Sequence, residues 1–163
     1  MNQYTLETAE SIQITPYDHN KDKQFVMSLI DEYAPFLSYE FAGKPVGTTE
    51  KCLTEKDHYT YLLRKNNNPI GFINFAIEEK KNSKDKIGSM DLLGIDKNNQ
   101  KKGYGLILIE YALKKLKELN VSEVFLIVNK ENIKAQRVYE KIGFIADSKF
   151  DDLRVWRYVK KLN

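Results

Sequence analysis

The chain has 163 residues, of which 42% are apolar and 30% charged, and its formal net charge at pH 7 is +3. This length fits one domain, residues 1–163, that buries a hydrophobic core. No apolar run approaches the roughly 18 residues of a membrane-spanning helix, and residues 1–10 lack the basic and apolar segments of a secretory signal. We therefore expect a cytoplasmic protein that does not contact membranes.

The chain has one cysteine, Cys52, and two histidines, His19 and His58. A single cysteine excludes an internal disulfide, and these three side chains are too few for a zinc site, so we expect no metal. The 26 basic residues are spread among 23 acidic ones and form no concentrated basic face. We expect no nucleic-acid partner; a basic nucleic-acid-binding domain stays as an alternative, which steep salt dependence of binding would reveal.

Apolar spacing predicts a strand, two helices and a two-stranded hairpin in the N-terminal half, at residues 11–15, 22–33, 49–56, 59–65 and 70–78. Pro35 disfavours helix in the residue before it, so we expect a break there. The second helix would be capped by Thr48 or Thr49. Residues 66–69 form the turn of the hairpin.

The C-terminal half is predicted to contain a strand at about 87–95, a helix that ends near Leu119, and an apolar strand at 124–128. Because this last strand is apolar throughout, we expect it to be covered on both faces. Asn132 opens another helix, which Gly143 ends, and two antiparallel strands follow. This order of elements indicates a single α/β domain on a mixed sheet.

The segment 93–105 joins the strand at 87–95 to the long helix through a polar turn that ends in Gly103 and Gly105. A strand that leads into a glycine-bearing helix start places free N–H groups at the positive end of the helix dipole. Such a site binds anions, phosphate above all. The nucleotide-binding motifs do not fit, because Lys102 precedes its glycine and Leu108 stands where a dinucleotide fingerprint needs a third glycine.

The pattern that does fit is Q-x-x-G-x-G, formed by Gln100, Gly103 and Gly105. It resembles the acyl-CoA-binding motif of the GNAT superfamily of N-acetyltransferases. A second segment, Asn132-x-x-Ala135-x-x-x-Tyr139-Glu140-Lys141-x-Gly143-Phe144, is similar to another motif of this superfamily. The resemblance is strong over residues 87–144. It implies a GNAT-like fold, with a central mixed, mostly antiparallel sheet of six to seven strands and about four helices.

The resemblance also implies acetyl-CoA as co-substrate. The pyrophosphate would be held at Gln100 and by the segment Lys101, Lys102, Gly103, Tyr104 and Gly105, whose lysine side chains either add charge or are simply solvated. The preceding strand would offer the backbone of Leu93 and Ile95 to the pantetheine arm, and Gly94 would allow a bulge that separates this strand from the next. A donor near Leu93 would stabilise the oxyanion. Asn132 would either bond pantetheine or cap its helix.

For the chemistry, the resemblance points to Tyr139 as the acid that protonates the departing thiolate; the alternative is an aromatic that fills the core. Asp91, the one carboxylate on its strand, is our candidate base, unless it pairs with a lysine or lies at an exposed strand end. The resemblance implies that the first helices and the β-hairpin shape the acceptor pocket. Tyr33, Phe36 and Tyr39 are therefore candidate walls, although such aromatics also form core or dimer contacts.

Together these features predict an N-acetyltransferase in which a primary amine, on a small molecule or a peptide, attacks the thioester directly. Cys52 lies outside both motifs, so an acyl-cysteine route has no support. The alternative is a non-catalytic acyl-CoA-binding or sensor module of the same fold. The sequence discloses neither the acceptor nor the choice between monomer and homodimer.

Overall fold

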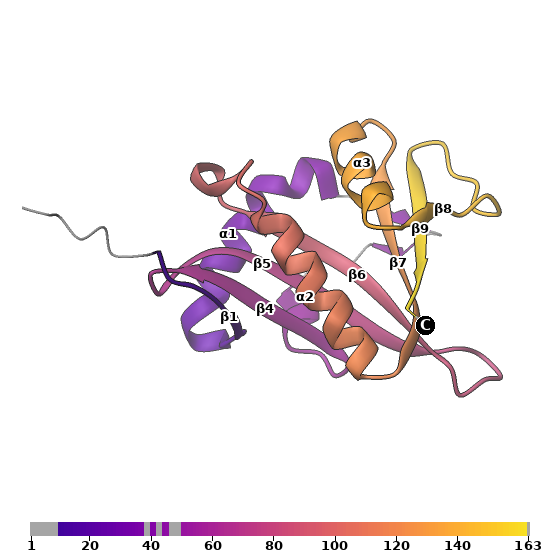
Figure 1. The fold of residues 1–163 in the computed structure, drawn as a ribbon, viewed down its shortest axis with the longest axis horizontal. Coiled ribbons are helices and arrows are strands. Elements are labelled where there is room, and N and C mark those ends of the chain that lie inside the picture. Colours follow the sequence, from indigo (N-terminus) through magenta and orange to yellow (C-terminus); the bar gives the residue numbers. More distant parts are fainter. Residues whose placement is uncertain (1–9, 38–39, 42–43, 46–49, 163) are drawn as a thin grey trace, which may run out of the picture.

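The computed structural model describes residues 10–37, 40–41, 44–45 and 50–162. Seven strands form one sheet in the order β1-β4-β5-β6-β7-β9-β8 (Figure 1). These strands are β1 (Ile12–Pro16), β4 (His58–Lys65), β5 (Asn68–Glu79), β6 (Lys86–Ile95), β7 (Val121–Asn129), β8 (Ile145–Ala146) and β9 (Val155–Lys161). Strands β2 (Glu40–Phe41) and β3 (Lys44–Pro45) form a separate small pair.

The helices are α1 (His19–Leu37), α2 (Tyr104–Glu118) and α3 (Ile133–Lys141), with short 3₁₀ turns η1 (Glu50–Leu53) and η2 (Lys97–Asn99). In the main sheet every neighbouring pair is antiparallel except β6 and β7, which α2 connects. The predicted mixed, mostly antiparallel sheet is confirmed, with three α-helices in the described part of the chain where about four helices were expected. None of the described helices is long and apolar enough to cross a bilayer.

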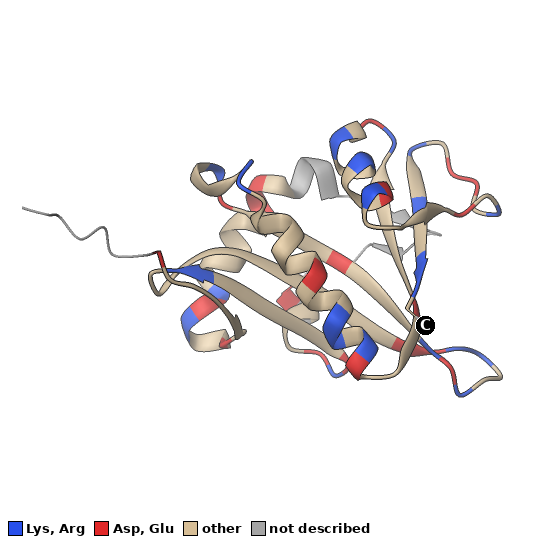
Figure 2. Cartoon of the chain, in the orientation of Figure 1, with Lys and Arg blue, Asp and Glu red and all other residues tan. Residues whose placement is uncertain are grey.

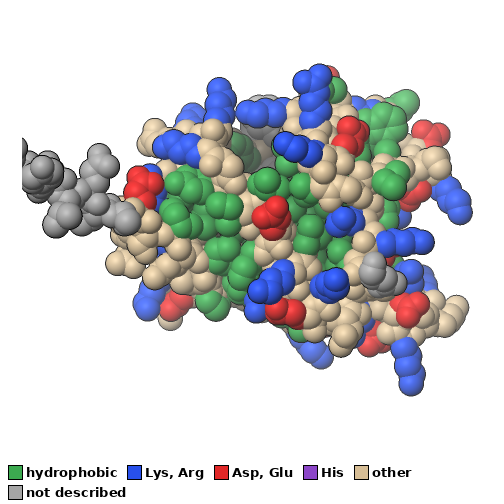
Figure 3. All heavy atoms as spheres, viewed as in Figure 1, with side chains coloured by type: hydrophobic (Ala, Val, Ile, Leu, Met, Phe, Trp, Pro, Cys, Tyr) green, Lys and Arg blue, Asp and Glu red, His purple; other side chains and the backbone are tan. Residues whose placement is uncertain are grey.

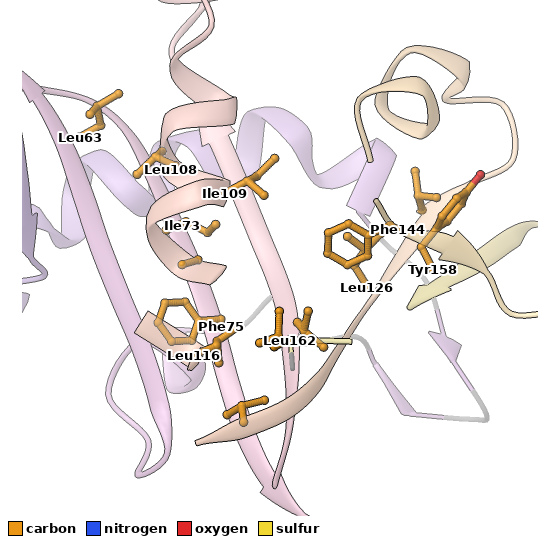
Figure 4. Packing of buried hydrophobic residues seen from close by; sticks show 14 of the residues in the cluster. Leu63, Ile73, Phe75, Leu108, Ile109, Leu116, Leu126, Phe144, Tyr158 and Leu162 are labelled. Atoms are coloured by element: carbon orange, nitrogen blue, oxygen red, sulfur yellow. The ribbon is translucent and has the colours of Figure 1, made fainter. Parts of the chain in front are cut away.

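Two hydrophobic clusters place the helices on opposite faces of the sheet. Leu108, Ile109 and Leu116 of α2 pack with Ile73 and Phe75 of β5 (Figure 4), and α3 lies against the same cluster. On the other face, α1 and η1 pack against the sheet in a second cluster: Val26, Leu29, Ile30, Leu53, Leu62, Phe72 and Leu92. The sheet is therefore the middle layer of three.

Helix α1 continues through Pro35 to Leu37, so the predicted break is wrong. Proline removes one amide donor and crowds the carbonyl one turn earlier. At Pro35 this cost falls on the last turn, where the helix has few bonds left to lose. The second predicted helix is shorter than expected: only the 3₁₀ turn η1 forms, and Thr48 and Thr49 lie outside the described residues.

The hairpin between β4 and β5 is tighter than predicted. Lys65 pairs with Asn68, so only Asn66 and Asn67 form the turn, with φ of 49° and 68°. Positive φ at both positions is the two-residue turn that matches the twist of antiparallel strands, and asparagine tolerates it. The β4–β5 register, which sets which side chains share a face, is thereby fixed at one end.

Strand β7 is longer than predicted and is not covered on both faces. Val124, Leu126 and Val128 are buried against the α2–α3 side, whereas Phe125 and Ile127 are half-buried. The guanidinium of Arg157 covers the Phe125 ring at 4.4 Å. The second cluster, on the α1 face, includes no residue of β7, which explains the difference.

A buried ion pair ties α1 to β4. Arg64 donates to Asp22 Oδ1 at 2.7 Å and to Thr15 Oγ1 at 2.9 Å, and the Asp18 amide donates to Asp22 Oδ2 at 3.0 Å. The Asp22 side chain is 2% exposed, so its charge depends on these partners. The pair holds the start of α1 against the sheet edge.

We expect Arg64→Leu to lower the free energy of unfolding by about 3–5 kcal/mol, because it leaves a buried carboxylate without its partner. The matched control is Lys65→Leu on the same strand. Lys65 Nζ lies at the same 2.7 Å from Glu10, but Glu10 is 59% exposed, and such surface pairs contribute about 0–1 kcal/mol. Urea unfolding at pH 7 measures both; equal losses would contradict the role of burial.

Candidate active site

Strands β6 and β7 part along their length. Their parallel pairing covers only Lys86–Ser89 of β6 and Val121–Phe125 of β7. From Met90 to Ile95, β6 pairs with β5 alone. The backbone of β6 beyond Ser89 therefore borders an opening in the sheet on the side of β7.

The β5–β6 ladder has an irregularity at Asp91. Asn74 pairs with Leu92 and Phe75 with Met90, so Asp91 is an extra residue without a partner on β5. Such a bulge bends its strand and redirects a side chain. The expectation that Gly94 allows the bulge is therefore wrong: Gly94 stays in register, and a Cβ there would lie 3.0 Å from the Phe72 ring, so its role is close packing.

The backbone groups of Leu93 and Ile95 point away from β5. The Asp96 amide donates to the Ile70 carbonyl at 2.9 Å, so the pair Ile95–Gly71 is one that exchanges no hydrogen bond. In an antiparallel ladder such residues direct both N–H and C=O outward, and the pattern repeats every second residue. Leu93 and Ile95 thus face the opening, as the sequence predicted for the pantetheine strand.

The Ile95 carbonyl is already occupied. It accepts from Tyr33 Oη at 2.7 Å and from Gln100 Nε2 at 3.0 Å, and Gln100 Nε2 also donates to Tyr33 Oη. Burial, and then the nearby Glu32 and Asp96 carboxylates, raise the pKa of Tyr33. These bonds join α1, the end of β6 and the loop before α2. The side chains of Gln100 and Tyr33 therefore hold the loop against the end of β6.

The start of α2 has no side-chain cap. Gly103 occupies the N-cap position with φ of 83°, and the Ile107 amide makes the first helical bond, to the Gly103 carbonyl at 3.2 Å. The preceding three amides, from Tyr104 to Leu106, have no partner within the helix. A Cβ on Gly103 would meet nothing within 4 Å, and one on Gly105 only Leu93 Cδ2 at 3.9 Å. Open space and free donors at a positive helix end fit a phosphate group.

Basic residues stand on both sides of this helix start, on the loop before α2 and on α3 (Figure 2). Lys101, with φ of 62°, and Lys102 are exposed and form no ion pair with another described residue. Helix α3 adds Lys134, Arg137 and Lys141. Figure 3 shows the surface hollowed between the start of α2 and α3. The hollow therefore has a positive rim, which favours an anionic ligand.

Asn132 caps α3, since its Oδ1 accepts from the Ala135 amide at 3.1 Å. Gln136 Nε2 donates to the carbonyls of Asn129 and Lys130 at 3.1 and 2.9 Å, which fixes α3 to the end of β7. Of the two roles predicted for Asn132, the cap is observed, and the amide nitrogen is free of that bond. Helix α3 is thereby held at the far side of the opening.

Tyr139 lies on the inner side of α3, half-buried against the same hydrophobic cluster as Leu93. Its ring meets Phe144 edge-to-face at 5.8 Å between centroids. Burial raises the pKa of Tyr139 to about 12, so the phenol stays protonated at neutral pH. Its hydroxyl makes no hydrogen bond with another described residue, which leaves the proton available for a ligand.

Asp91 lies on the face of the sheet opposite to Tyr139. Burial raises the pKa of its carboxyl to about 6; a hydrogen bond from Ser89 and the charge of His58 oppose this, and Glu78 reinforces it. Above this pH the carboxylate can accept a proton. Tyr139 and Asp91 therefore lie on opposite faces of the sheet, a protonated phenol on one and a carboxyl with a raised pKa on the other.

The predicted acceptor residues are only partly described. Tyr33 packs beside the second hydrophobic cluster, and its hydroxyl donates to the Ile95 carbonyl. Phe36 lies in α1, but its side chain is not described, and Tyr39 lies outside the described residues.

Two residues of this region were missed in the sequence. His58 and Asn74 each have a buried side-chain atom without a hydrogen-bond partner, Nδ1 and Oδ1 respectively. A lone amide within the apolar run 70–77 was a signal for Asn74; His58 gave none. In the described parts of the chain, no three His, Cys, Asp or Glu side chains are grouped to hold a metal.

The chain is similar to known proteins both in sequence and in fold. The chain matches the model of the acetyltransferase (GNAT) family over residues 17–144. The Bacillus subtilis protein YxbD is 28% identical over 89 residues, which are 55% of this chain and 51% of YxbD. The chain thus spans about half the length of this curated relative.

Solved structures share the fold at lower identity. A GNAT-family acetyltransferase from Streptococcus pneumoniae superposes with a TM-score of 0.68 at 18% identity, covering 93% of this chain and 99% of the other. Arabidopsis thaliana NAA60, solved in complex with acetyl-CoA, gives 0.71 at 14% identity, with 93% and 98% covered. Since the family model spans most of the chain, including both motifs, the protein belongs to the GNAT family of acetyltransferases.

Proposed function

We propose that the protein is an acetyl-CoA-dependent N-acetyltransferase in which a primary amine attacks the thioester directly. The observation that carries this proposal is the opening between β6 and β7. There, the outward backbone of Leu93 lies next to the uncapped start of α2, with Tyr139 and Asp91 on opposite faces. Binding, proton removal and proton donation then each have a group in place.

The chain's residues would hold acetyl-CoA as follows. The amides from Tyr104 to Leu106 donate to the diphosphate, and Lys101 and Lys102 supply charge nearby. Charge-assisted bonds of this kind are about twice as strong as neutral ones. The backbone of Leu93 bonds the pantetheine arm in the manner of a neighbouring strand. Gly105 leaves room for that arm beside Leu93.

Asp91, ionised above a pKa of about 6, takes a proton from the acceptor's ammonium group, which leaves a neutral amine. The Leu93 amide stabilises the negative oxygen that forms as the amine adds to the thioester carbonyl. Tyr139 then donates its phenolic proton to the departing sulfur. One amide bond forms and one thioester bond breaks. The nitrogen, cationic after its attack, loses its second proton to solvent, and the phenolate regains a proton from solvent.

The first prediction concerns coenzyme binding. We expect the protein to bind CoA and acetyl-CoA, and Gly105→Leu to weaken binding at least about tenfold, or 1.4 kcal/mol, because its side chain extends toward Leu93. Gly105→Ala is the control: its Cβ makes only an ordinary contact, at 3.9 Å, and binding should stay unchanged. Isothermal titration calorimetry measures all three proteins. Absence of binding at millimolar CoA by the folded wild type would end the proposal.

Activity is tested by thiol release from acetyl-CoA with a panel of polyamines, aminoglycosides, amino acids, peptide N-termini and lysine peptides. A transferase releases CoA with at least one class of amine. A sensor module would bind acetyl-CoA and release nothing with any of them. The panel also identifies the acceptor for the variants below.

Tyr139→Phe should lower kcat by about 100-fold or more, the size of a general-acid contribution. Acetyl-CoA affinity and thermal stability should stay near wild type, because the ring still packs against Phe144 and the hydroxyl has no described partner to lose. Steady-state kinetics and thermal melting separate these effects. An unchanged kcat would remove Tyr139 from the chemistry.

For Asp91, activity and stability should change in opposite directions. In the wild type kcat/KM should fall below about pH 6 as Asp91 becomes protonated, and Asp91→Asn should lower the rate and abolish this dependence. The folded-state pKa is about 6, above the ordinary value of 3.8, so ionisation destabilises the fold. Asp91→Asn should therefore be more stable above pH 6, by at most about 3 kcal/mol, and equal to wild type near pH 4. Glu110→Gln, on the exposed side of α2, is the control; a similar profile for both variants would acquit Asp91.

A further inference from the structure

Five polar side chains interrupt the apolar α1 face of the sheet. His58 and Thr60 come from β4, Asn74 from β5, and Ser89 and Asp91 from β6; we call these five residues the polar cluster. Farther along the same face the corresponding positions are Leu62, Phe72 and Leu92, all in the second hydrophobic cluster. The change from apolar to polar occurs where β6 and β7 begin to part.

Strand register brings the polar cluster together. Thr60 pairs with Asn74, and His58 pairs with Ala76, which pairs with Ser89. Cross-strand partners share a face of the sheet. Two strand spacings, about 9.5 Å, separate β4 from β6, and the residue of β5 in register between His58 and Ser89 is the small Ala76. The register therefore places His58 and the carboxyl-bearing segment of β6 on one face, with a small residue on the strand between them.

The polar cluster is not closed by its own hydrogen bonds. Asn74 is fully buried; its Nδ2 donates to Thr60 Oγ1 at 2.8 Å and to the Cys52 carbonyl of η1 at 3.3 Å, yet its Oδ1 has no partner. His58 Nδ1 is likewise buried and unpartnered. Each such atom is unfavourable for the fold. Buried polar atoms left open in this way are typical of sites that hold water or exchange protons.

His58 also connects the polar cluster to solvent. Its Nε2 lies 3.7 Å from Glu55 Oε2, and the Glu55 side chain is 49% exposed. On its inner side His58 is close enough to Asp91 for its charge to lower the pKa of that carboxyl. Asp91, His58 and Glu55 thus form a row of titratable groups that leads from the opening to the surface.

We propose that His58 is a positioning residue that removes the proton from Asp91 and passes it through Glu55 to solvent. The inference rests on the proposed function, since it supplies the exit for the proton that Asp91 takes from the ammonium group. The Asp91 O–H bond breaks as a bond to His58 Nδ1 forms, with one water able to bridge the gap. His58 Nε2–H then passes its proton to Glu55, and Glu55 to water. Asp91 returns to the carboxylate, and no charge accumulates.

The first test needs no substrate. The Asp91 carboxyl signal is followed by carbon NMR against pH, assigned with Asp91→Asn. In His58→Gln the pKa of Asp91 should rise above about 6, because the lowering influence of His58 is lost while burial and the repulsion from Glu78 remain. His19→Gln is the matched control: His19 is the other histidine and pairs with Glu50 on the surface. Equal titration in both variants would overturn the proposal.

The second test measures transfer with the best amine of the panel. His58→Ala should lower kcat about tenfold or more, and added imidazole should restore much of it by filling the vacated space. Imidazole should not rescue Asp91→Asn, and His19→Ala should behave as wild type. Failure of imidazole to raise the rate, with acetyl-CoA binding intact, would overturn the relay.

Glu55→Gln gives a second variant that cannot disturb the interior, because Glu55 lies on the surface. It should lower kcat in dilute buffer and recover as buffer concentration rises; a rate equal to wild type in dilute buffer would exclude Glu55 from the exit. A wild type that transfers acetyl to no amine would instead refute the proposed function, and the carboxyl titration would still decide the coupling of His58 to Asp91.

Discussion

The parting of β6 and β7 is the constraint on which the rest of the structure depends. A parallel pair that stops at Ser89 and Phe125 leaves the remaining backbone donors and acceptors of β6 without a neighbouring strand. Unpaired backbone groups inside a protein are costly, so they must find other partners. At Ile95 the protein supplies them through Tyr33 and Gln100. At Leu93 no described residue of η2, α1 or the loop supplies one, and in the proposed function the pantetheine arm takes this place.

This arrangement explains the division of the molecule into two faces. Helices α2 and α3 bring the open helix start and the phenol of Tyr139 to one side, whereas α1, η1 and the polar cluster lie on the other. The two sides communicate only where the sheet is open. In the proposed reaction, the donor coenzyme and the acceptor amine would enter from opposite faces and meet there. The hydrogen bonds around the Ile95 carbonyl connect α1 to the loop before α2. They therefore fix the position of one face of the sheet relative to the other.

Much of the fold was predictable because its elements have strong local signals. The apolar period of α2, the asparagine cap and terminal glycine of α3 and the turn between β4 and β5 are local features, and each element was located to within a few residues. Coverage of β7 was not predictable, because it depends on where α1 packs rather than on the strand itself. Pro35 misled because its cost depends on its distance from the helix end, which the sequence does not state.

The glycine-bearing start of α2 was predictable for the same reason: Gly103 is at an N-cap position where φ is positive, and the glycine of the motif meets that local need. The polar cluster was not, because His58, Asn74 and Asp91 are distant in the chain and become neighbours only through the register of three strands. The extra residue at Asp91 adds to the difficulty, since a bulge changes which face a side chain takes. A local sequence pattern is enough to locate a loop. Residues that meet across strands can be identified only when the register of the sheet is known.

Two carboxylates, Asp22 and Asp91, differ in how fully their oxygens are hydrogen-bonded. Asp22 is only 1% exposed, and Arg64 and the Asp18 amide satisfy both its oxygens. The fold can therefore satisfy a buried carboxylate where only stability is at stake. Asp91 is given a single serine hydroxyl and a histidine charge, and Asn74 and His58 each keep an open acceptor atom beside it. Full satisfaction would stabilise the protein, so the open atoms on β4 and β5, on the face that also carries Asp91, fit the proposal that this face accepts and releases a proton.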